Sequence, residues 1–151
     1  NSREIAGYGI GSIFLIRSAV AIAHQIGIKS LFALCAPYTV KPVAGVGMEL
    51  ENSVGNLGTF YYPKLDLVAT TMLLKDVPTL AKALEEDRTA IFKIRDNANI
   101  VRTEELRGKF IKIHYETEIP NLESWNLQEV IANAKINFLK NNLNGDNVTF
   151  V

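Results

Sequence analysis

This sequence has very few residues of the types that form disulfides, metal clusters or histidine-based catalytic sites. Of its 151 residues only Cys35 is a cysteine, and only His24 and His114 are histidines. A single cysteine excludes an internal disulfide and a cysteine-based metal cluster. The sequence contains no Ser-His-Asp or Cys-His-Asp pattern and no HExxH motif. It therefore predicts no metal site and assigns no catalytic residue.

The chain also lacks an excess of charge of either sign, because 16 Lys and Arg residues balance 16 Asp and Glu residues. This balance argues against nucleic acid or a membrane surface as a partner. Hydrophobic residues make up 48% and charged residues 21% of the chain, as in a soluble globular domain with a buried core. The longest early apolar run is interrupted by Arg17 and His24, which argues against a membrane span or a signal peptide. We expect a cytoplasmic protein, and since the chain begins with Asn1 we expect an upstream part.

Glycine is concentrated near the start of the chain, in the segment Ala6-Gly7-Tyr8-Gly9-Ile10-Gly11-Ser12. Glycines at alternate positions allow a tight bend and leave backbone N–H groups uncovered by side chains. An apolar run of helix length follows to about Ile26, with Ser12 as its expected N-cap. Such a turn offers orphan N–H donors and the positive end of a helix dipole to a phosphate or pyrophosphate. The residues of this predicted cofactor site are Gly7, Tyr8, Gly9, Ile10, Gly11 and Ser12.

Two better-known phosphate motifs do not fit this turn. A Walker loop ends in Gly-Lys-Ser or Gly-Lys-Thr, whereas Gly11-Ser12 lacks the lysine. A dinucleotide fingerprint requires a preceding strand, a further glycine where Phe14 stands, and an acidic residue about 20 positions later. No Asp or Glu occurs between Glu4 and Glu49. The turn is therefore expected in another α/β fold, although glycines that serve only packing remain an alternative.

The rest of the chain alternates between helix and strand patterns. On a helical wheel Arg17, Ser18, Ala21, His24 and Gln25 share one arc, which predicts an amphipathic surface helix ended by Gly27. Further helices are expected around Pro42, over Val77 to Asp87 and over Glu123 to Leu143, the last with a buried side that includes Trp125, Val130 and Phe138. Strands are expected over Ile28 to Cys35, Met48 to Leu50, Leu65 to Leu74, Thr89 to Asp96 and Phe110 to Glu116.

The order of these features resembles the second half of the GNAT acyltransferase fold, over about residues 4–76. In that superfamily an Arg/Gln-x-x-Gly-x-Gly/Ala turn holds the pyrophosphate of coenzyme A, and Gly9 and Gly11 match its glycines. Val43 to Leu50 is similar to the Tyr-x-x-x-Gly-Phe block, and Phe60 to Asp76 is most similar to the N-acyl amino acid synthases, relatives of the acyl-homoserine-lactone synthases. Ala6 stands at the Arg/Gln position, and Val43 stands where a frequently catalytic tyrosine would be.

The resemblance implies a fold and a reaction. The implied fold is an α/β (α+β) domain with a GNAT-like mixed sheet flanked by helices. Residues 1–76 would form the C-terminal half of its core, and residues 77–151 would form a strand-plus-helix extension packed on the same domain. The family's first four strands would then precede Asn1. The reaction is transfer of an acyl group from acyl-CoA or acyl carrier protein to a primary amine such as an amino acid. The chain is then part of an N-acyltransferase. An oligomeric assembly is compatible with this function. The alternative is a non-catalytic acyl-CoA-binding or interaction domain on a degenerate GNAT-like scaffold, which the departures at Ala6 and Val43 favour.

Single reactive residues are interpreted more simply. Cys35, at the end of an apolar run, is expected to be a buried structural thiol rather than a nucleophile. His24 is expected in solvent, and His114 on a strand surface, because the sequence identifies no partner for it. Glu85-Glu86-Asp87-Arg88 is expected to be a solvated helix end. Tyr61 and Tyr62 are expected to cover the core from a loop.

Overall fold

The structure is a computed structural model that describes residues 10–106 and 108–143. It divides into two units, Asn1–Pro120 and Asn121–Val151, each described here by itself. The helices of the first unit are α2 (Ile10–Gln25), α3 (Val40–Gly45) and α4 (Glu85–Asp96). Its strands are β1 (Leu31–Cys35), β2 (Glu49–Leu50), β3 (Thr59–Tyr62), β4 (Leu67–Leu74), β5 (Asn99–Leu106) and β6 (Lys109–Glu116). The chain is thus an α+β protein whose described strand pairs are all antiparallel.

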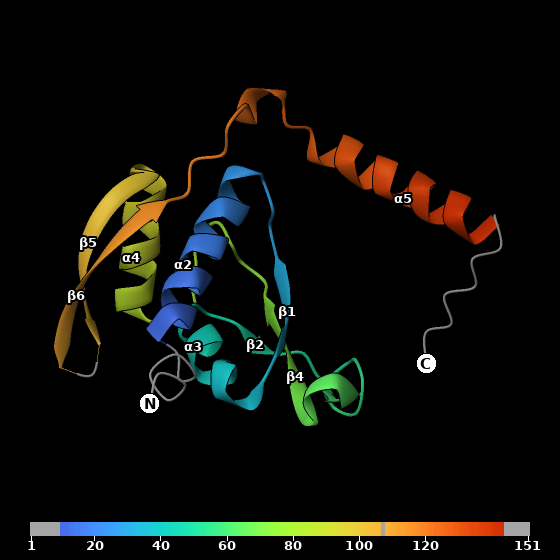
Figure 1. The fold of residues 1–151 in the computed structure, drawn as a ribbon, viewed down its shortest axis with the longest axis horizontal. Coiled ribbons are helices and arrows are strands. Elements are labelled where there is room, and N and C mark those ends of the chain that lie inside the picture. Colours follow the sequence, from blue (N-terminus) through green and yellow to red (C-terminus); the bar gives the residue numbers. More distant parts are fainter. Residues whose placement is uncertain (1–9, 107, 144–151) are drawn as a thin grey trace. The chain divides into compact units, whose positions relative to one another are not determined.

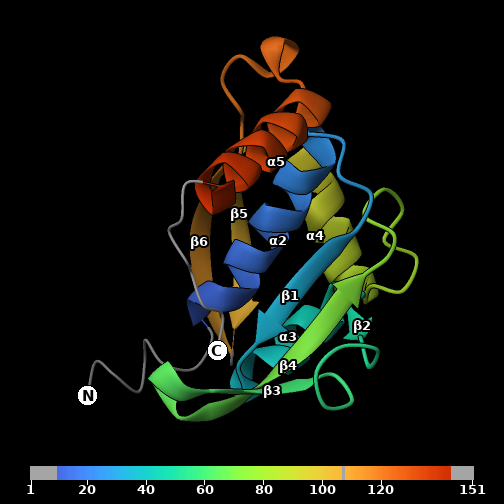
Figure 2. The ribbon, with the colours of Figure 1, turned by 90° about the vertical axis from the view of Figure 1, so that its right-hand side faces the viewer.

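A four-stranded sheet forms one layer of the first unit. Its order is β1-β4-β2, and β3 also pairs with β4. The central strand β4 has the sequence LVATTMLL, whose β-branched and apolar residues suit a strand with neighbours on both sides. This confirms the strand predicted over Leu65 to Leu74. Helices α2 and α3 lie on one side of the sheet (Figures 1 and 2).

Helix α2 lies at the centre of the first unit. Figure 1 shows it between the four-stranded sheet and a second layer made of α4 and the β5–β6 hairpin. Both Arg17 and Ala21 are buried, so the predicted surface helix with Arg17 on its solvent face is wrong. Packing from two sides buries residues all around a helix, which an amphipathic pattern does not anticipate. The hydrophobic core contains Phe14, Val20, Ala21 and Ala23 of α2 together with Val43, Val46, Met72, Leu74, Val77, Leu80, Ile91, Ile94 and Tyr115.

The end of α2 follows its predicted form. Gly27 adopts φ 77°, the left-handed conformation that glycine allows without strain. The Gly27 N–H donates to the His24 carbonyl at 3.1 Å and the Ile28 N–H donates to the Ala23 carbonyl at 3.0 Å. This pair of bonds is a Schellman cap, which closes the helix and turns the chain toward β1. The predicted glycine C-cap is confirmed.

The segment after β4 differs from the prediction. No helix covers Val77 to Leu84; Val77 and Leu80 are anchored in the core, and α4 begins only at Glu85. The strand predicted over Thr89 to Asp96 is wrong, because these residues belong to α4. The buried positions Asp87, Ala90, Ile91 and Ile94 have the spacing of a helix face, and acidic residues in the first turn and basic residues in the last turn favour the helix dipole.

Strands β5 and β6 form a separate two-stranded sheet. Their register pairs Asn99 with Glu116 and Glu104 with Ile111, and the turn between them contains Gly108 at φ 74°. The strand predicted over Phe110 to Glu116 is confirmed, whereas β5 was not anticipated. An isolated hairpin has little stability of its own. The hairpin is therefore stabilised by side chains that pack against or within the hydrophobic core. These side chains are Ile100, Ile111, Ile113 and Tyr115.

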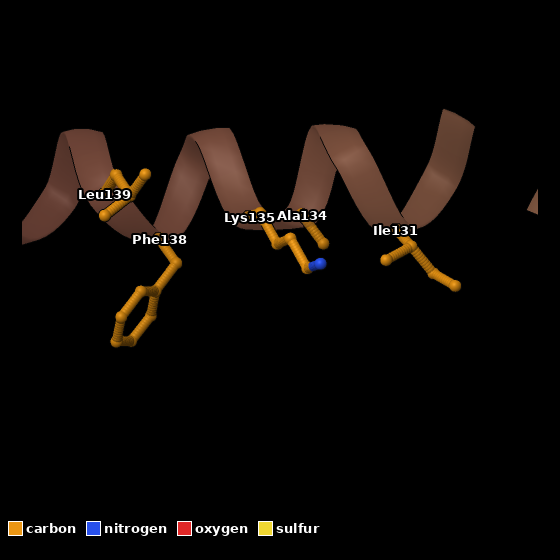
Figure 3. A pocket seen from close by; sticks show the side chains of 5 residues that line it. All are labelled: Ile131, Ala134, Lys135, Phe138 and Leu139. Carbon is orange, nitrogen blue, oxygen red and sulfur yellow. The ribbon is translucent and has the colours of Figure 1, made fainter. Parts of the chain in front are cut away.

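The second unit contains the helix α5 (Leu127–Leu143), preceded by a 3-10 turn at Leu122–Ser124. The Asn126 side-chain oxygen accepts from the N–H groups of Gln128 and Glu129, as an N-cap residue does. The side predicted to be buried is exposed at Trp125, Val130 and Phe138. Figure 3 shows Ile131, Ala134 and Phe138 on this side of the helix.

The observed division at Pro120 places α4 and the hairpin with the sheet, rather than in a part that begins at residue 77. The division of function between residues 1–76 and 77–151 stays a prediction. Within the described ranges, no helix is long and apolar enough to cross a membrane.

Candidate functional site

The predicted phosphate site falls at the start of α2. Gly7, Tyr8 and Gly9 lie outside the described residues, whereas Ile10, Gly11 and Ser12 form the first turn of the helix. Ser12 is the third helical residue and not the N-cap, because α2 begins at Ile10 and not at Ile13 as expected. The N–H groups of a first turn have no carbonyl partner within their helix. The N–H groups of Ile10 and Gly11 are therefore the candidate donors to an anion.

No packing contact with the described residues requires a glycine at position 11. Gly11 is exposed, and no described atom lies within 4 Å of the position that a Cβ would take. Gly45 is different, since a Cβ there would lie 2.7 Å from a carboxylate oxygen of Asp87. Glycine destabilises a helix relative to alanine, so a glycine without a packing role in a first turn is unfavourable for folding alone. Close approach of another molecule to the backbone gives such a glycine a use.

An open groove of about 750 Å³ runs along α2 from Gly11. Its helical wall contains residues at successive turns of one face, from Gly11 to Ile22, and its other wall is β6. At 1.5 Å per residue, this stretch of helix is about 16 Å long. The groove is lined by Gly11, Phe14, Leu15, Ser18 and Ile22 of α2 and by Ile113, His114, Tyr115, Glu116 and the adjoining Thr117. A helix N-terminus at one end and an apolar wall are features that could accommodate a molecule with a phosphate group and a hydrocarbon part.

His114 on the β6 wall has partners that the sequence did not indicate. Its Nε2 lies 2.5 Å from the Asn99 side-chain oxygen, and its Nδ1 lies 3.4 Å from a carboxylate oxygen of Glu116. Glu116 is two residues away on the same strand face, and Asn99 lies on the paired strand. The period of two in a strand was the available signal for Glu116. Asn99 could not be identified as a partner of His114 from the sequence, because its position depends on the pairing register of β5 and β6.

A second group of polar residues is buried beneath the groove. Arg17 is 6% exposed, Asp87 3% and Glu104 7%, which is unusual for charged side chains. The Arg17 Nε donates to Asp87 at 2.8 Å, and its terminal nitrogens lie 2.7 Å from Asp87 and 3.1 Å from Glu104. Glu104 also accepts from the Arg102 Nε at 2.8 Å and from the Tyr115 hydroxyl at 3.2 Å. The positive charges of two guanidinium groups thus balance the negative charges of two carboxylates. This buried cluster connects α2, α4 and the hairpin.

Burial shapes the protonation of this cluster. Burial alone would lower the pKa of Arg17, but the hydrogen bond that Arg17 donates to Asp87 and the charges of Asp87 and Glu104 outweigh it and raise that pKa. Burial, together with the charge of Glu104, raises the pKa of the Tyr115 hydroxyl to about 12. Each charge of the cluster is paired with an opposite charge. The cluster therefore acts as a clamp between elements and not as a proton-transfer site.

The sequence had placed two members of this cluster in solvent. Arg17 was assigned to the polar helix face, and Asp87 to a solvated helix end together with Glu85 and Glu86. The structure confirms exposure only for Glu85 and Glu86. Asp87 is buried because the next turns of α4 bury Ala90 and Ile91 on the same face. The available signal for Arg17 was its position inside an apolar run.

Other sequence candidates are accounted for by packing. Cys35 is buried, and burial raises the pKa of its thiol, as expected for a structural cysteine. Val43 is buried in the core, and its side chain has no acidic group. Gly47 adopts φ 95°, and a Cβ there would lie 3.0 Å from the Ala83 backbone nitrogen. Tyr61 and Tyr62 are exposed and do not cover the core, and the Tyr61 hydroxyl donates to Asp66 at 2.8 Å.

In the part of the chain that the structure describes, no three His, Cys, Asp or Glu side chains are grouped so that they could hold a metal ion. The candidate site is therefore the first turn of α2 with the groove beside it. No protein-family model, no curated protein and no solved structure matches this chain.

Proposed function

We propose that the chain binds the phosphates of an acyl donor at the first turn of α2 and is part of an N-acyltransferase. The observation that carries this proposal is an exposed glycine in that turn, which no described packing contact requires, at the end of an apolar groove. The donor is acyl-CoA or the acyl-pantetheine of a carrier protein, and the acceptor is a primary amine. Phosphate oxygens accept from the first-turn N–H groups, and the apolar wall contacts the hydrocarbon part of the donor.

The order of elements supports the same proposal. A helix, a glycine cap, the strand β1, the short helix α3, the strand β2 and the long strand β4 occur in the order that the GNAT resemblance implies, with the additional strand β3 between β2 and β4. In the reaction the amine nitrogen bonds to the thioester carbon, the carbon–sulfur bond breaks and the thiol leaves. Holding thioester and amine together supplies much of the rate, and a proton acceptor and oxyanion donors are also needed.

A specific observation favours the alternative of a non-catalytic acyl-binding domain. Val43, at the position where the family often has its catalytic tyrosine, is 4% exposed and packs in the hydrophobic core. That position therefore supplies neither an acid nor a hydrogen bond to a leaving thiolate. Release of free thiol separates the two functions: thioester binding without thiol release, across a panel of primary amines, would favour the binding domain.

Calorimetric titration with coenzyme A and with a long-chain acyl-CoA tests donor binding. Gly11→Asp should abolish binding of both ligands, because a carboxylate in the first turn repels phosphates. The matched variant Gly11→Ala should raise the free energy of unfolding by about 0.5–1 kcal/mol, since alanine favours helix more than glycine does. It should nevertheless weaken binding, because its methyl group obstructs the approach to the backbone.

A further variant tests the groove. Leu15, on the α2 wall, is largely exposed, so Leu15→Lys should leave the fold intact. We expect it to weaken binding of the acyl-CoA and to leave binding of coenzyme A itself unchanged. Absence of binding to wild type well above micromolar concentrations would refute the proposal and favour glycines that serve packing alone. Unaltered binding by Gly11→Asp would show that the phosphates lie elsewhere.

A further inference from the structure

The outer edge of β1 has the properties of a strand-pairing surface. β1 is the last strand of the sheet order, and no described strand lies along its other edge. Its sequence is LFALC, without a charge or a proline. Natural edge strands are usually protected from pairing by charges, prolines, bulges or short length. The opposite side of the sheet is divided between β3 and the two-residue β2, so it offers no comparable continuous edge.

The sheet face beside this edge is apolar and open. Phe32 is 56% exposed and Leu34 is 52% exposed, whereas Cys35 faces the covered side and is buried. Leu73, the partner of Phe32 across the sheet, is half-buried, and Thr71, the partner of Leu34, is buried. Figure 2 shows α2 and α3 behind β1 and β4, which leaves the near face of the sheet without a helix from the first unit.

We propose that β1 pairs with β1 of a second copy of this chain, antiparallel, about a two-fold axis through Ala33. This register pairs all five residues of the strand: Ala33 faces its own copy, Phe32 faces Leu34 and Leu31 faces Cys35. A two-fold interface requires such self-complementarity, and here no charge faces another. The result is a continuous sheet of eight strands, four from each copy, within the usual size of open sheets. The inference does not depend on the acyl donor.

The pairing also adds contacts between side chains on the open face of the sheet. Residues directly opposite in an antiparallel pair have Cβ atoms about 5 Å apart. Phe32 of each copy therefore contacts Leu34 of the other, and two aromatic–aliphatic pairs lie side by side across the axis. Because the edge of β1 is uncharged and pairs with itself in this register, we expect it to bind a second copy rather than a charged extended peptide.

Self-association can be measured by analytical ultracentrifugation, in reducing buffer, over roughly a hundredfold range of protein concentration. We expect the wild-type chain to shift from monomer to dimer. Phe32→Lys and Leu34→Glu should each weaken the dimer at least about tenfold, a change of about 1.4 kcal/mol. Both side chains are half exposed, so circular dichroism and the melting temperature should stay near wild type. Val101→Lys, which replaces a side chain that is 60% exposed on the hairpin, is the matched control and should dimerise normally.

Mixing the two charge variants tests the register. In a mixed dimer the lysine at position 32 of one copy faces the glutamate at position 34 of the other, so the mixture should associate more strongly than either variant alone. A wild-type chain that stays monomeric over the whole range would overturn the proposal. Normal dimerisation of Phe32→Lys, equal weakening by Val101→Lys, or no recovery on mixing would also overturn it.

Discussion

At the scale of single residues, Arg17 has the strongest claim to a structural role. It is the one residue in the buried cluster that contacts both carboxylates, Asp87 from α4 and Glu104 from β5. A planar guanidinium can donate to both at once, whereas a lysine ammonium has no fork of that shape. The aromatic ring of Phe14 lies beneath the same guanidinium, 5.9 Å from its central carbon. The position of the hairpin on α2 therefore depends on this side chain.

Removing the guanidinium should be costly because it leaves two buried carboxylates without their shared partner. We expect Arg17→Met to lower the free energy of unfolding by about 3–5 kcal/mol, measured by urea denaturation. Arg17→Lys should be only partly tolerated. Adding Asp87→Asn and Glu104→Gln to Arg17→Met should recover part of the loss, because the uncompensated charges are then gone. A loss below about 1 kcal/mol, typical of a surface ion pair, would contradict a buried clamp.

Tyr115 gives the same cluster a measurable pH dependence. Its hydroxyl has a pKa of about 12 in the folded chain, against about 10 in an unfolded chain. Between these values the unfolded chain has lost this proton while the folded chain retains it. The stabilising contribution is therefore complete below pH 10 and is lost as the pH rises toward 12. Tyr115→Phe should fall less steeply in stability over this window than wild type, measured by urea denaturation at successive pH values. If the free energy of unfolding fell with pH at the same slope in wild type and Tyr115→Phe, the buried hydroxyl would be excluded as the source of the pH dependence.

At the scale of elements, local signals predicted the structure well where one kind of signal acted alone. The Gly27 cap and the apolar β4 strand followed from glycine conformation and β-branched residues. The prediction failed over Val77 to Asp96, where Pro78 suggested an early helix and the later residues alternated in polarity. In the structure Val77 and Leu80 bury their side chains in a turn, and α4 buries residues at helical spacing. Tertiary contacts decided this segment, and no local pattern contains them.

The candidate site was predictable to a similar degree. Glycine before a helix indicated the first turn of α2, and Gly11 occupies it. The groove beside that turn requires β6, which begins at Lys109, far along the chain from the first turn of α2. Its approach to α2 depends on the cluster around Arg17, and sequence reasoning placed Arg17 and its partner Asp87 in solvent. A site formed by one local segment is visible in a sequence, whereas a wall contributed by a distant hairpin is not.

The helix α5 tests a purely local contribution. Asn126 accepts from the N–H groups of Gln128 at 3.1 Å and Glu129 at 3.2 Å, which satisfies two of the orphan donors of the first turn. Asn126→Ala should destabilise the helix by about 1 kcal/mol. Faster amide hydrogen exchange over the first turn of α5 would report this loss, and Asn126→Asp should retain slow exchange. Exchange unchanged by Asn126→Ala would mean that other groups hold the first turn.

At the scale of the whole molecule, the central position of α2 determines how a ligand would act. The helix packs against α3 and α4, and its side chains bond to the hairpin through Arg17 and Gln25. Its N-terminal turn, where we propose that phosphates bind, belongs to the same rigid helix. Ordering that turn therefore stabilises an element on which both layers of the first unit depend.

Binding to the folded chain alone should raise its stability by mass action. At a free concentration of about 100 times Kd the gain is about 2.7 kcal/mol, which a thermal melt detects as a higher Tm. Long-chain acyl-CoA should raise Tm more than coenzyme A at equal concentration, because the groove adds apolar contacts. Slower hydrogen exchange should extend from α2 into α4 and β6, and not stay confined to the first turn. Gly11→Asp should show none of these gains while melting near wild type without ligand, because the space around Gly11 is open. Equal ligand-induced shifts in wild type and Gly11→Asp would separate the stabilisation from the first turn of α2 and contradict the proposed site.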